Sequence, residues 1–294
     1  MKRTLLIFTM VFAVIVNLMT FTIEAANEVK YDIQIEKLSD SEDAKEFNLY
    51  RDELLSYFNK LIIKEKLTSL KKSDLDFKNE DTIQGVKVYG DYTTYKINAS
   101  YEDIMGSLKG SGYSWKILIK TEKTAVFAVI SPCDKAADNK FCFGKDNKWS
   151  VDFCQVSKSQ GKEGSSTIAA VSAYSLYDSA ETNLNDLITA NKNDEIKVVY
   201  TNIGQSENDS YDYINGGIVF VNGKAKYIYS RGFILHTDRV SEKIPDYIKT
   251  ILETNYTSDM CLNTLHSEYG CTHIKGLYNY DQVMALIKTY ETYA

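Results

Sequence analysis

The chain is short of the motifs that mark several common classes of enzyme and sensor. It contains no Gly-x-Ser-x-Gly turn, no phosphate-binding glycine loop and no loop with the ligand spacing of an EF-hand. Its basic residues form no cluster beyond Lys71-Lys72, and the formal net charge is −6. A modestly acidic chain has no general attraction for phosphate backbones, so we expect no nucleic-acid partner. These patterns give catalysis no positive support, and they favour a non-catalytic protein without excluding an enzyme.

Proline is also scarce, with two residues among 294, whereas tyrosine is abundant, with 22. Lysine, asparagine and isoleucine are frequent too, and these common residues all have AT-rich codons. Genome composition alone explains the set, so the tyrosine content is weak support for ligand binding.

The N-terminus has the order of features that is typical of a secretory signal peptide. Lys2-Arg3 is followed by an apolar run from Leu5 to Ile23, and then by the small residues Ala25 and Ala26. We expect residues 1–25 to be removed near Ala25 or Ala26, which predicts a secreted or periplasmic protein. The run is close to the roughly 20 apolar residues that span a bilayer, so an uncleaved membrane anchor is the alternative.

The rest of the chain has the composition of a globular protein, with 44% hydrophobic and 25% charged residues. Helical and alternating patterns both occur, and they predict an α+β fold with a mixed or antiparallel sheet, or sheets, and packed amphipathic helices. The Ser-, Gly- and Lys-rich stretch from Ser157 to Thr167 is the best candidate for a linker. It separates an N-terminal region, 27–157, from a C-terminal region, 168–294, and these could form two small subdomains.

The N-terminal region begins with apolar residues at helical spacing, which predict a helix over about 40–67 with a capping box at Ser39. A hairpin is expected next, with its turn at Gly90-Asp91, then a short helix capped by Ser100. A second hairpin over 113–130 and a strand from Trp149 complete the order helix-ββαββ-strand.

The C-terminal region predicts a strand at 168–177, a helix, and a strand at 196–203. Asn222-Gly223 is the strongest turn signal in the chain and predicts a type I′ hairpin. A helix is expected near Pro245, and a last helix begins after Asn279.

Five cysteines lie in the part of the chain that we expect to be exported, where disulfides are the ordinary fate of thiols. Two local bridges are predicted, Cys133–Cys142 and Cys261–Cys271, and Cys154 is left as a free thiol. If Trp149, Val151 and Phe153 face inward, Cys154 lies on the opposite face of its strand. Pairing of Cys142 with Cys154, with Cys133 free, is the main alternative.

Metal binding competes with the second disulfide. Residues Cys261, His266, Cys271 and His273 are four ligand types suited to tetrahedral zinc. Because export favours oxidation of the thiols, we expect a disulfide there and no metal or other cofactor. Were the cysteines paired, His236, His266 and His273 would remain as a three-histidine alternative.

The function predicted from these patterns is that of an exported, non-catalytic binding or interaction protein with a protein or carbohydrate ligand. Its candidate surface carries Tyr89 and Tyr92, near Lys87 and Lys96, because exposed tyrosines beside polar groups suit such contacts. An exported hydrolase, with or without a metal held by the histidines, is the alternative. Membrane association is expected only if the leader is retained.

Overall fold

The structure is a computed structural model that describes residues 31–133, 140–159, 193–203, 214–236, 263–266 and 271–293, together with residues 188, 190 and 191. The chain divides into two units, Met1–Tyr31 and Asp32–Ala294, and the architecture below belongs to the second. The predicted leader, the strand at 168–177 with the helix that follows it, and the helix near Pro245 lie outside the described residues, as does most of the predicted linker.

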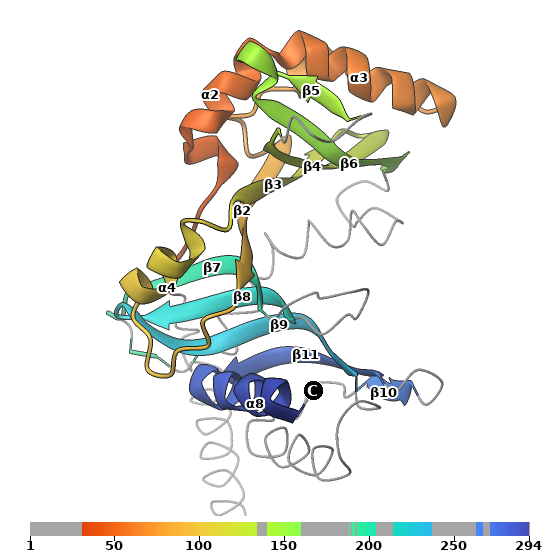
Figure 1. Ribbon diagram of the computed structural model, residues 1–294. Coiled ribbons are helices and arrows are strands. Elements are labelled where there is room, and N and C mark those ends of the chain that lie inside the picture. Colours follow the sequence, from red (N-terminus) through yellow and green to blue (C-terminus); the bar gives the residue numbers. More distant parts are fainter. Residues whose placement is uncertain are drawn as a thin grey trace, which may run out of the picture. The chain divides into compact units, whose positions relative to one another are not determined.

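The second unit is built mainly of strands (Figure 1). Its strands are β1 (Ile33–Ile35), β2 (Ile83–Tyr92), β3 (Tyr113–Lys120), β4 (Thr124–Pro132), β5 (Phe141–Phe143), β6 (Trp149–Lys158), β7 (Ile196–Ile203), β8 (Ile214–Val221), β9 (Lys224–His236), β10 (Asn263–His266) and β11 (Cys271–Asn279). Its helices are α2 (Glu42–Leu49), α3 (Arg51–Lys64), α4 (Tyr101–Leu108) and α8 (Tyr280–Tyr293), with 3-10 turns η1 (Leu38–Asp40), η2 (Lys72–Asp74) and η3 (Lys145–Asn147). Among the described residues, no helix is both long enough and apolar enough to cross a membrane.

All of these strands belong to one mixed sheet, in the order β10-β11-β9-β8-β7-β2-β3-β4-β6-β5, with β1 paired to β7 beside this path. The pairs β2–β7 and β1–β7 are parallel, and the remaining pairs are antiparallel. The predicted α+β class is therefore wrong, because the fold is dominated by a sheet with few helices. Strand β2 of the N-terminal region pairs with β7 of the C-terminal region, so one sheet runs through both. That long-range parallel pairing has no local signature in the sequence.

The first core lies between helices α2 and α3 and strands β3, β4 and β6. Phe47 of α2 is at its centre, in edge-to-face contact with Phe77, Phe143 and Trp149 at centroid distances of 5.5, 5.5 and 5.0 Å. Such contacts add to the gain from burying the rings. The helix predicted over 40–67 is confirmed in kind, but it is interrupted at Tyr50. The helix is not capped by the predicted Ser39. Ser41 caps it instead, by accepting a hydrogen bond from the Ala44 amide.

The second core lies between α4, α8 and strands β7, β8 and β9, and includes Val199, Ile218 and Ile228. The register places both cores on one face of the sheet. Tyr89 of β2 is opposite Tyr113 on one side and Thr201 on the other, and directly paired residues share a face. Tyr89 therefore lies between the two cores.

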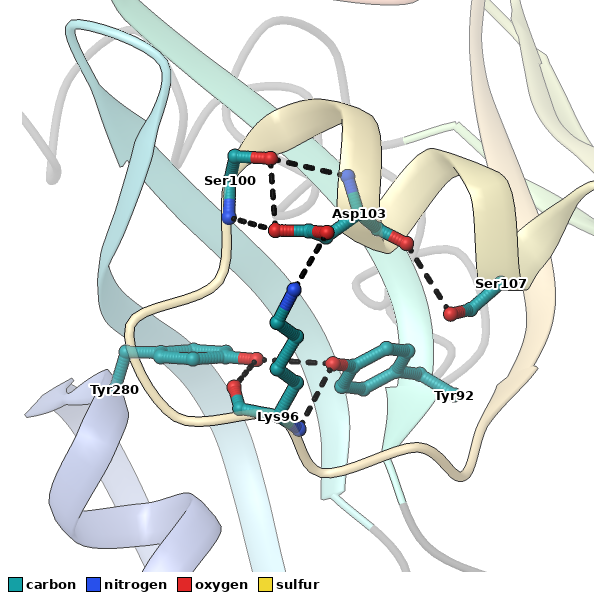
Figure 2. A network of polar contacts seen from close by, with 6 residues as sticks. All are labelled: Tyr92, Lys96, Ser100, Asp103, Ser107 and Tyr280. Carbon is teal, nitrogen blue, oxygen red and sulfur yellow. Dashed lines mark hydrogen bonds and ion pairs between the residues drawn. The ribbon is translucent and has the colours of Figure 1, made fainter.

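A ring of hydrogen bonds ties the loop after β2 to helix α8 (Figure 2). The Lys96 amide donates to the Tyr92 hydroxyl (3.3 Å), that hydroxyl and Tyr280 Oη are 3.1 Å apart, and Tyr280 donates to the Lys96 carbonyl (2.9 Å). Because Tyr280 uses its proton on the carbonyl, Tyr92 is the donor between the two phenols. Burial, and then the contact with Tyr92, raises the pKa of Tyr280 well above its usual range.

Helix α4 is fastened to the same loop. Ser100 caps it, as predicted, by accepting from the Asp103 amide at 3.1 Å, and the Asp103 carboxylate accepts from the Ser100 amide at 2.9 Å. Lys96 Nζ lies 2.7 Å from Asp103 Oδ1. These contacts, that from Lys96 first, hold the pKa of Asp103 far below its usual range. The loop is thus held at both ends.

The predicted turn at Gly90-Asp91 is wrong. Strand β2 continues through it to Tyr92, because its far end pairs with β7, with Asp91 opposite Asn202. The residues expected to form the return strand are a loop instead, in which Tyr95 and Asn98 have φ values of 44° and 54°. Left-handed backbone of that kind is incompatible with a strand.

The turn at Asn222-Gly223 is confirmed, with φ values of 50° and 73° between β8 and β9. Positive φ at both turn residues is what a type I′ hairpin requires. The last helix also begins as predicted, since Asn279 Oδ1 accepts from the Gln282 amide at 3.1 Å.

Candidate functional site

A cleft of about 480 Å³ opens beside strands β2 and β3, where the chain passes from β1 into α2. We call it the Lys87 cleft. It is lined by the aromatic rings of Tyr113 and Trp115 and by charged groups of both signs. The carboxylates are those of Glu36, Asp40, Glu42 and Asp43, and the ammonium groups are those of Lys37 and Lys87.

Local structure explains why carboxylates collect there. Glu42 and Asp43 lie in the first turn of α2, where negative charge is favoured by the exposed amides and the helix dipole. Strands β2 and β3 supply the opposite wall, because their register pairs Lys87 with Trp115. The cleft thus joins an acidic helix start to an aromatic sheet surface.

The ammonium group of Lys87 is held by aromatic rings and one carboxylate. Its Nζ lies 4.3 Å from the centroid of the Tyr113 ring and 5.2 Å from that of Tyr89. It also lies 3.1 Å from Glu36 Oε2, and the Lys87 side chain is only 19% exposed. A cation over aromatic faces gains about 0.5–2 kcal/mol, most where water is excluded. The cleft therefore already holds one ammonium group, that of Lys87.

Tyr89 and Tyr113 act as hydrogen-bond donors in this arrangement. Tyr89 donates to Glu36 Oε1 at 2.6 Å, and Tyr113 donates to Asp43 Oδ2 at 2.9 Å. Burial, and then these bonds to carboxylates, raises the pKa of both phenols well above the usual range. Both hydroxyls stay protonated at neutral pH and cannot serve there as bases.

The carboxylates of the cleft differ in whether a cation neutralises them. Glu36 is paired with Lys87, and Glu42 lies 2.7 Å from Lys45 Nζ, a contact that lowers the pKa of Glu42. Lys37, the other ammonium of the lining, is paired with Glu80 outside the cleft at 3.2 Å.

Two carboxylates remain. Within the part of the chain that the structure describes, neither Asp40 nor Asp43 has an ion-pair partner. Asp43 instead accepts from the phenol of Tyr113 and, at 2.9 Å, from Trp115 Nε1. The cleft consequently keeps a negative charge next to an aromatic wall.

The residues proposed from the sequence as a binding surface are separated by the structure. Lys87 lines the Lys87 cleft, and Tyr89 is not part of the lining but donates to its Glu36. Tyr92 is 1% exposed and lies in the ring with Tyr280 and Lys96. The acidic residues and Tyr113 were missed. Lys87 and Tyr89 on one strand and Tyr113 and Trp115 on the next form an alternating pattern that would have revealed the aromatic wall, had the β2–β3 register been known.

The first predicted disulfide pair is brought together. Cys133 and Cys142 are free thiols with their Sγ atoms 2.9 Å apart, so their pairing in an oxidising compartment stays a prediction. The contact with Cys133, more than burial, raises the pKa of Cys142, which disfavours a reactive thiolate.

Cys154 is placed differently from expectation. A β-bulge in β6 pairs Val129 with Phe153 but Ile130 with Val151, which leaves Asp152 as an extra residue. The bulge reverses the alternation, so Phe153 is 48% exposed and Cys154 packs against the first core. Burial raises the pKa of Cys154 to about 12, and its thiol is therefore not ionised at neutral pH.

The histidines proposed as metal ligands lie in strands β9, β10 and β11, at positions where the backbone alone is described, and Cys261 lies outside the described residues. Elsewhere, among residues with described side chains, no three of the metal-ligating types come together.

A second, larger cleft of about 960 Å³ lies at the β3–β4 turn. Its charged lining is balanced, with Lys71, Lys120 and Lys123 against Asp74, Asp81 and Glu122, and no aromatic residue is part of it. It has neither the net charge nor the aromatic wall of the Lys87 cleft, which we therefore regard as the stronger candidate.

Comparison with known proteins gives no match to a protein family, to a curated protein or to a solved structure.

Proposed function

We propose that the protein is an exported, non-catalytic binding protein whose Lys87 cleft takes a positively charged side chain of a basic protein partner. The observation that carries the proposal is that Asp40 and Asp43, which line the cleft with Tyr113, have no cation partner among the described residues. Carboxylate oxygens are strong hydrogen-bond acceptors for an ammonium or guanidinium group. The contacts of Lys87 show the same chemistry within the chain.

The geometry favours a charged ligand over a carbohydrate. Stacking on a sugar needs an open aromatic face, but Trp115 is 1% exposed and Tyr113 has Lys87 over its ring. The cleft therefore offers charge and hydrogen-bond acceptors more readily than a flat platform. This supports a protein partner over a carbohydrate, the other ligand class that the sequence suggests.

Binding is also favoured over acid–base catalysis. The phenols of Tyr89 and Tyr113 have raised pKa values and are engaged with carboxylates, so they position groups and do not exchange protons near neutral pH. The proposal of export rests on the leader-like N-terminal sequence. The adjacent thiols of Cys133 and Cys142, which oxidation would join, are consistent with it.

The proposal is tested by calorimetric titration with a blocked peptide, acetyl-Gly-Lys-Gly-Lys-Gly-amide. We expect saturable binding that weakens as salt is added, because screening acts on exposed charges. The glutamate version of the peptide and maltohexaose should give no binding. Binding of maltohexaose in place of the lysine peptide would refute the choice of ligand.

The matched variants are Asp43→Asn and Asp146→Asn. The first removes a charge from the cleft but keeps an oxygen that can accept from Tyr113, and we expect affinity to fall about 10-fold, since hydrogen bonds to charged groups contribute about 1.5–3 kcal/mol. The second makes the same change in η3, where the backbone has φ 56° and asparagine is well tolerated. Equal effects of the two variants would show that the cleft is not the site.

A further inference from the structure

Three aromatic rings surround the ammonium group of Lys87, and we call these rings, those of Tyr89, Tyr113 and Trp115, the aromatic cage. The Lys87 Nζ atom lies 4.3 Å from the centroid of the Tyr113 ring and 5.2 Å from that of Tyr89. Its distance to the Trp115 ring is 5.9 Å. All three distances are within the range of about 6 Å over which a ring attracts a cation. The carboxylate of Glu36 completes the surroundings, with its Oε2 atom 3.1 Å from Nζ.

The register of β2 and β3 explains why these rings meet at one ammonium group. Lys87 is directly opposite Trp115, and Tyr89 is directly opposite Tyr113. Directly opposed residues share a face of the sheet, and so do alternate residues of one strand. The ring of Tyr113 is inclined by 55° to that of Tyr89 and by 88° to that of Trp115. The rings are therefore not stacked on each other, and they approach the ammonium group from different directions.

The rings of the cage are held in place by carboxylates and not by Lys87. Tyr89 donates to Glu36 Oε1 at 2.6 Å. Tyr113 Oη and Trp115 Nε1 both donate to Asp43 Oδ2 at 2.9 Å. None of these hydrogen bonds involves the ammonium group, so we expect the cage to keep its shape when that group is removed.

We infer that Lys87 determines the ligand specificity of the cleft, because it fills the aromatic cage with a cation of the chain itself. Cages of this kind bind quaternary ammonium groups, which have no N–H to donate and rely on the aromatic faces. With the cage filled, a ligand cation is left with the carboxylates of Asp40 and Asp43. These bind through hydrogen bonds that a primary ammonium or a guanidinium group donates. The natural chain therefore accepts lysine or arginine and rejects trimethylated lysine.

This role for Lys87 rests on the proposed function, which places the ligand in the Lys87 cleft. It is tested by titrating the full chain with tetramethylammonium chloride, followed by the shift of the methyl proton signal that aromatic rings cause. The unaltered chain should show no saturable binding. Lys87→Ala empties the cage and leaves Glu36 without its cation, so we expect saturable binding at least about 10-fold tighter than the limit for the unaltered chain.

Two further variants separate the cage from the net charge. Lys87→Arg keeps a cation among the rings and should, like the unaltered chain, show no saturable binding. Lys45→Ala removes one positive charge elsewhere, since the Lys45 ammonium pairs at 2.7 Å with Glu42, a carboxylate of the cleft that is not part of the cage. It should leave tetramethylammonium binding as weak as before. Equal gains from Lys45→Ala and Lys87→Ala would overturn the role of the cage.

A measurement on the unaltered protein covers the case in which Lys87→Ala fails to fold. The Lys87 side chain is 19% exposed, whereas that of Lys72, in an ion pair with Asp52 at 2.6 Å, is 51% exposed. Acetylation of the amines, read at each lysine by mass spectrometry, should therefore modify Lys87 more slowly than Lys72. Equal rates would mean that the Lys87 ammonium does not occupy the cage, and would contradict the inferred role.

The lysine peptide allows this role and the proposed function to fail separately. If the peptide binds, trimethylation of its two lysines should weaken binding at least about 10-fold, because charge-assisted hydrogen bonds are lost. Equal affinities would refute the role of Lys87. A lysine peptide that does not bind, together with a gain of tetramethylammonium binding in Lys87→Ala, would refute the proposed function and support the cage. Binding of the lysine peptide without that gain would do the reverse.

Discussion

Lys87 lines a cleft and lies over the ring of Tyr89, whereas Tyr92 and Lys96, a few residues further along the chain, belong to a closed ring of hydrogen bonds. The sequence offers no reason to separate these two pairs, since both combine an aromatic hydroxyl with an ammonium group. Their neighbours decide the outcome. Tyr92 is covered by the loop that follows it and by Tyr280 of α8, whereas Tyr89 donates to Glu36, which lines the cleft.

This difference shows what a polar aromatic pair needs in order to remain available to a ligand. In the ring of hydrogen bonds, the hydroxyls of Tyr92 and Tyr280 each donate one bond and accept one within the protein. Neither hydroxyl has a proton left to donate to a ligand. In the cleft, Lys87 and Glu36 neutralise each other, but Asp40 and Asp43 bring further negative charge that no described cation matches. Surplus charge, and not the presence of tyrosine, distinguishes the site.

The two cores differ as well, and Phe47 gives the sharpest measure of the first. Its ring contacts three other aromatic rings and is fully buried, so Phe47→Ala should lower the free energy of unfolding by about 3–5 kcal/mol. Phe153→Ala is the matched control, because that ring is half exposed beyond the bulge. Urea unfolding should show a cost below about 1.5 kcal/mol for the control, and equal costs would contradict the assignment of faces.

The second core depends on its hydroxyl ring. Tyr280→Phe deprives Tyr92 of its acceptor and the Lys96 carbonyl of its donor, and a cost of about 1–3 kcal/mol is expected for unmet buried groups. Tyr57→Phe is the control, since Tyr57 packs by its ring on Phe141 at 4.3 Å. If the double variant Tyr92→Phe/Tyr280→Phe costs as much as the two single changes added together, the hydroxyls are not coupled.

Alkaline pH should affect both regions through their tyrosines. The pKa values of Tyr89, Tyr113 and Tyr280 are raised in the folded protein, so the unfolded chain loses these protons first as pH rises. Their stabilising contribution is complete below about pH 10, the ordinary tyrosine pKa, and decreases above it. Urea unfolding between pH 8 and 11 should show this decline, and Tyr89→Phe should make it shallower. An unchanged slope would mean that the phenol is not shielded.

Elements with local signals were predictable from the sequence, and pairings between distant segments were not. The cap at Ser100 and the turn at Asn222-Gly223 are set by neighbouring residues, and the structure confirms both. The parallel pairing of β2 with β7 depends on contacts far apart in the chain, so Gly90-Asp91 was mistaken for a turn.

The candidate site was predictable only in part, for the same reason. Tyr89 and Lys87 were identified as a surface, but Asp43 and Tyr113 reach them through the register and the position of α2. A single extra residue, Asp152, was enough to exchange the faces of Phe153 and Cys154. Alternation predicts a face correctly only until a bulge interrupts it.

The cleft is tested most directly by the two indole N–H resonances of the chain, which contains two tryptophans. Trp115 Nε1 donates to Asp43, whereas Trp149 Nε1 is buried in the first core without a hydrogen-bond partner among the described residues. On titration with the lysine peptide, the Trp115 indole signal should shift and saturate while that of Trp149 stays in place. A Trp115 signal that does not move at saturating peptide, or that moves equally in Asp43→Asn, would contradict the proposal that a cation binds at Asp43.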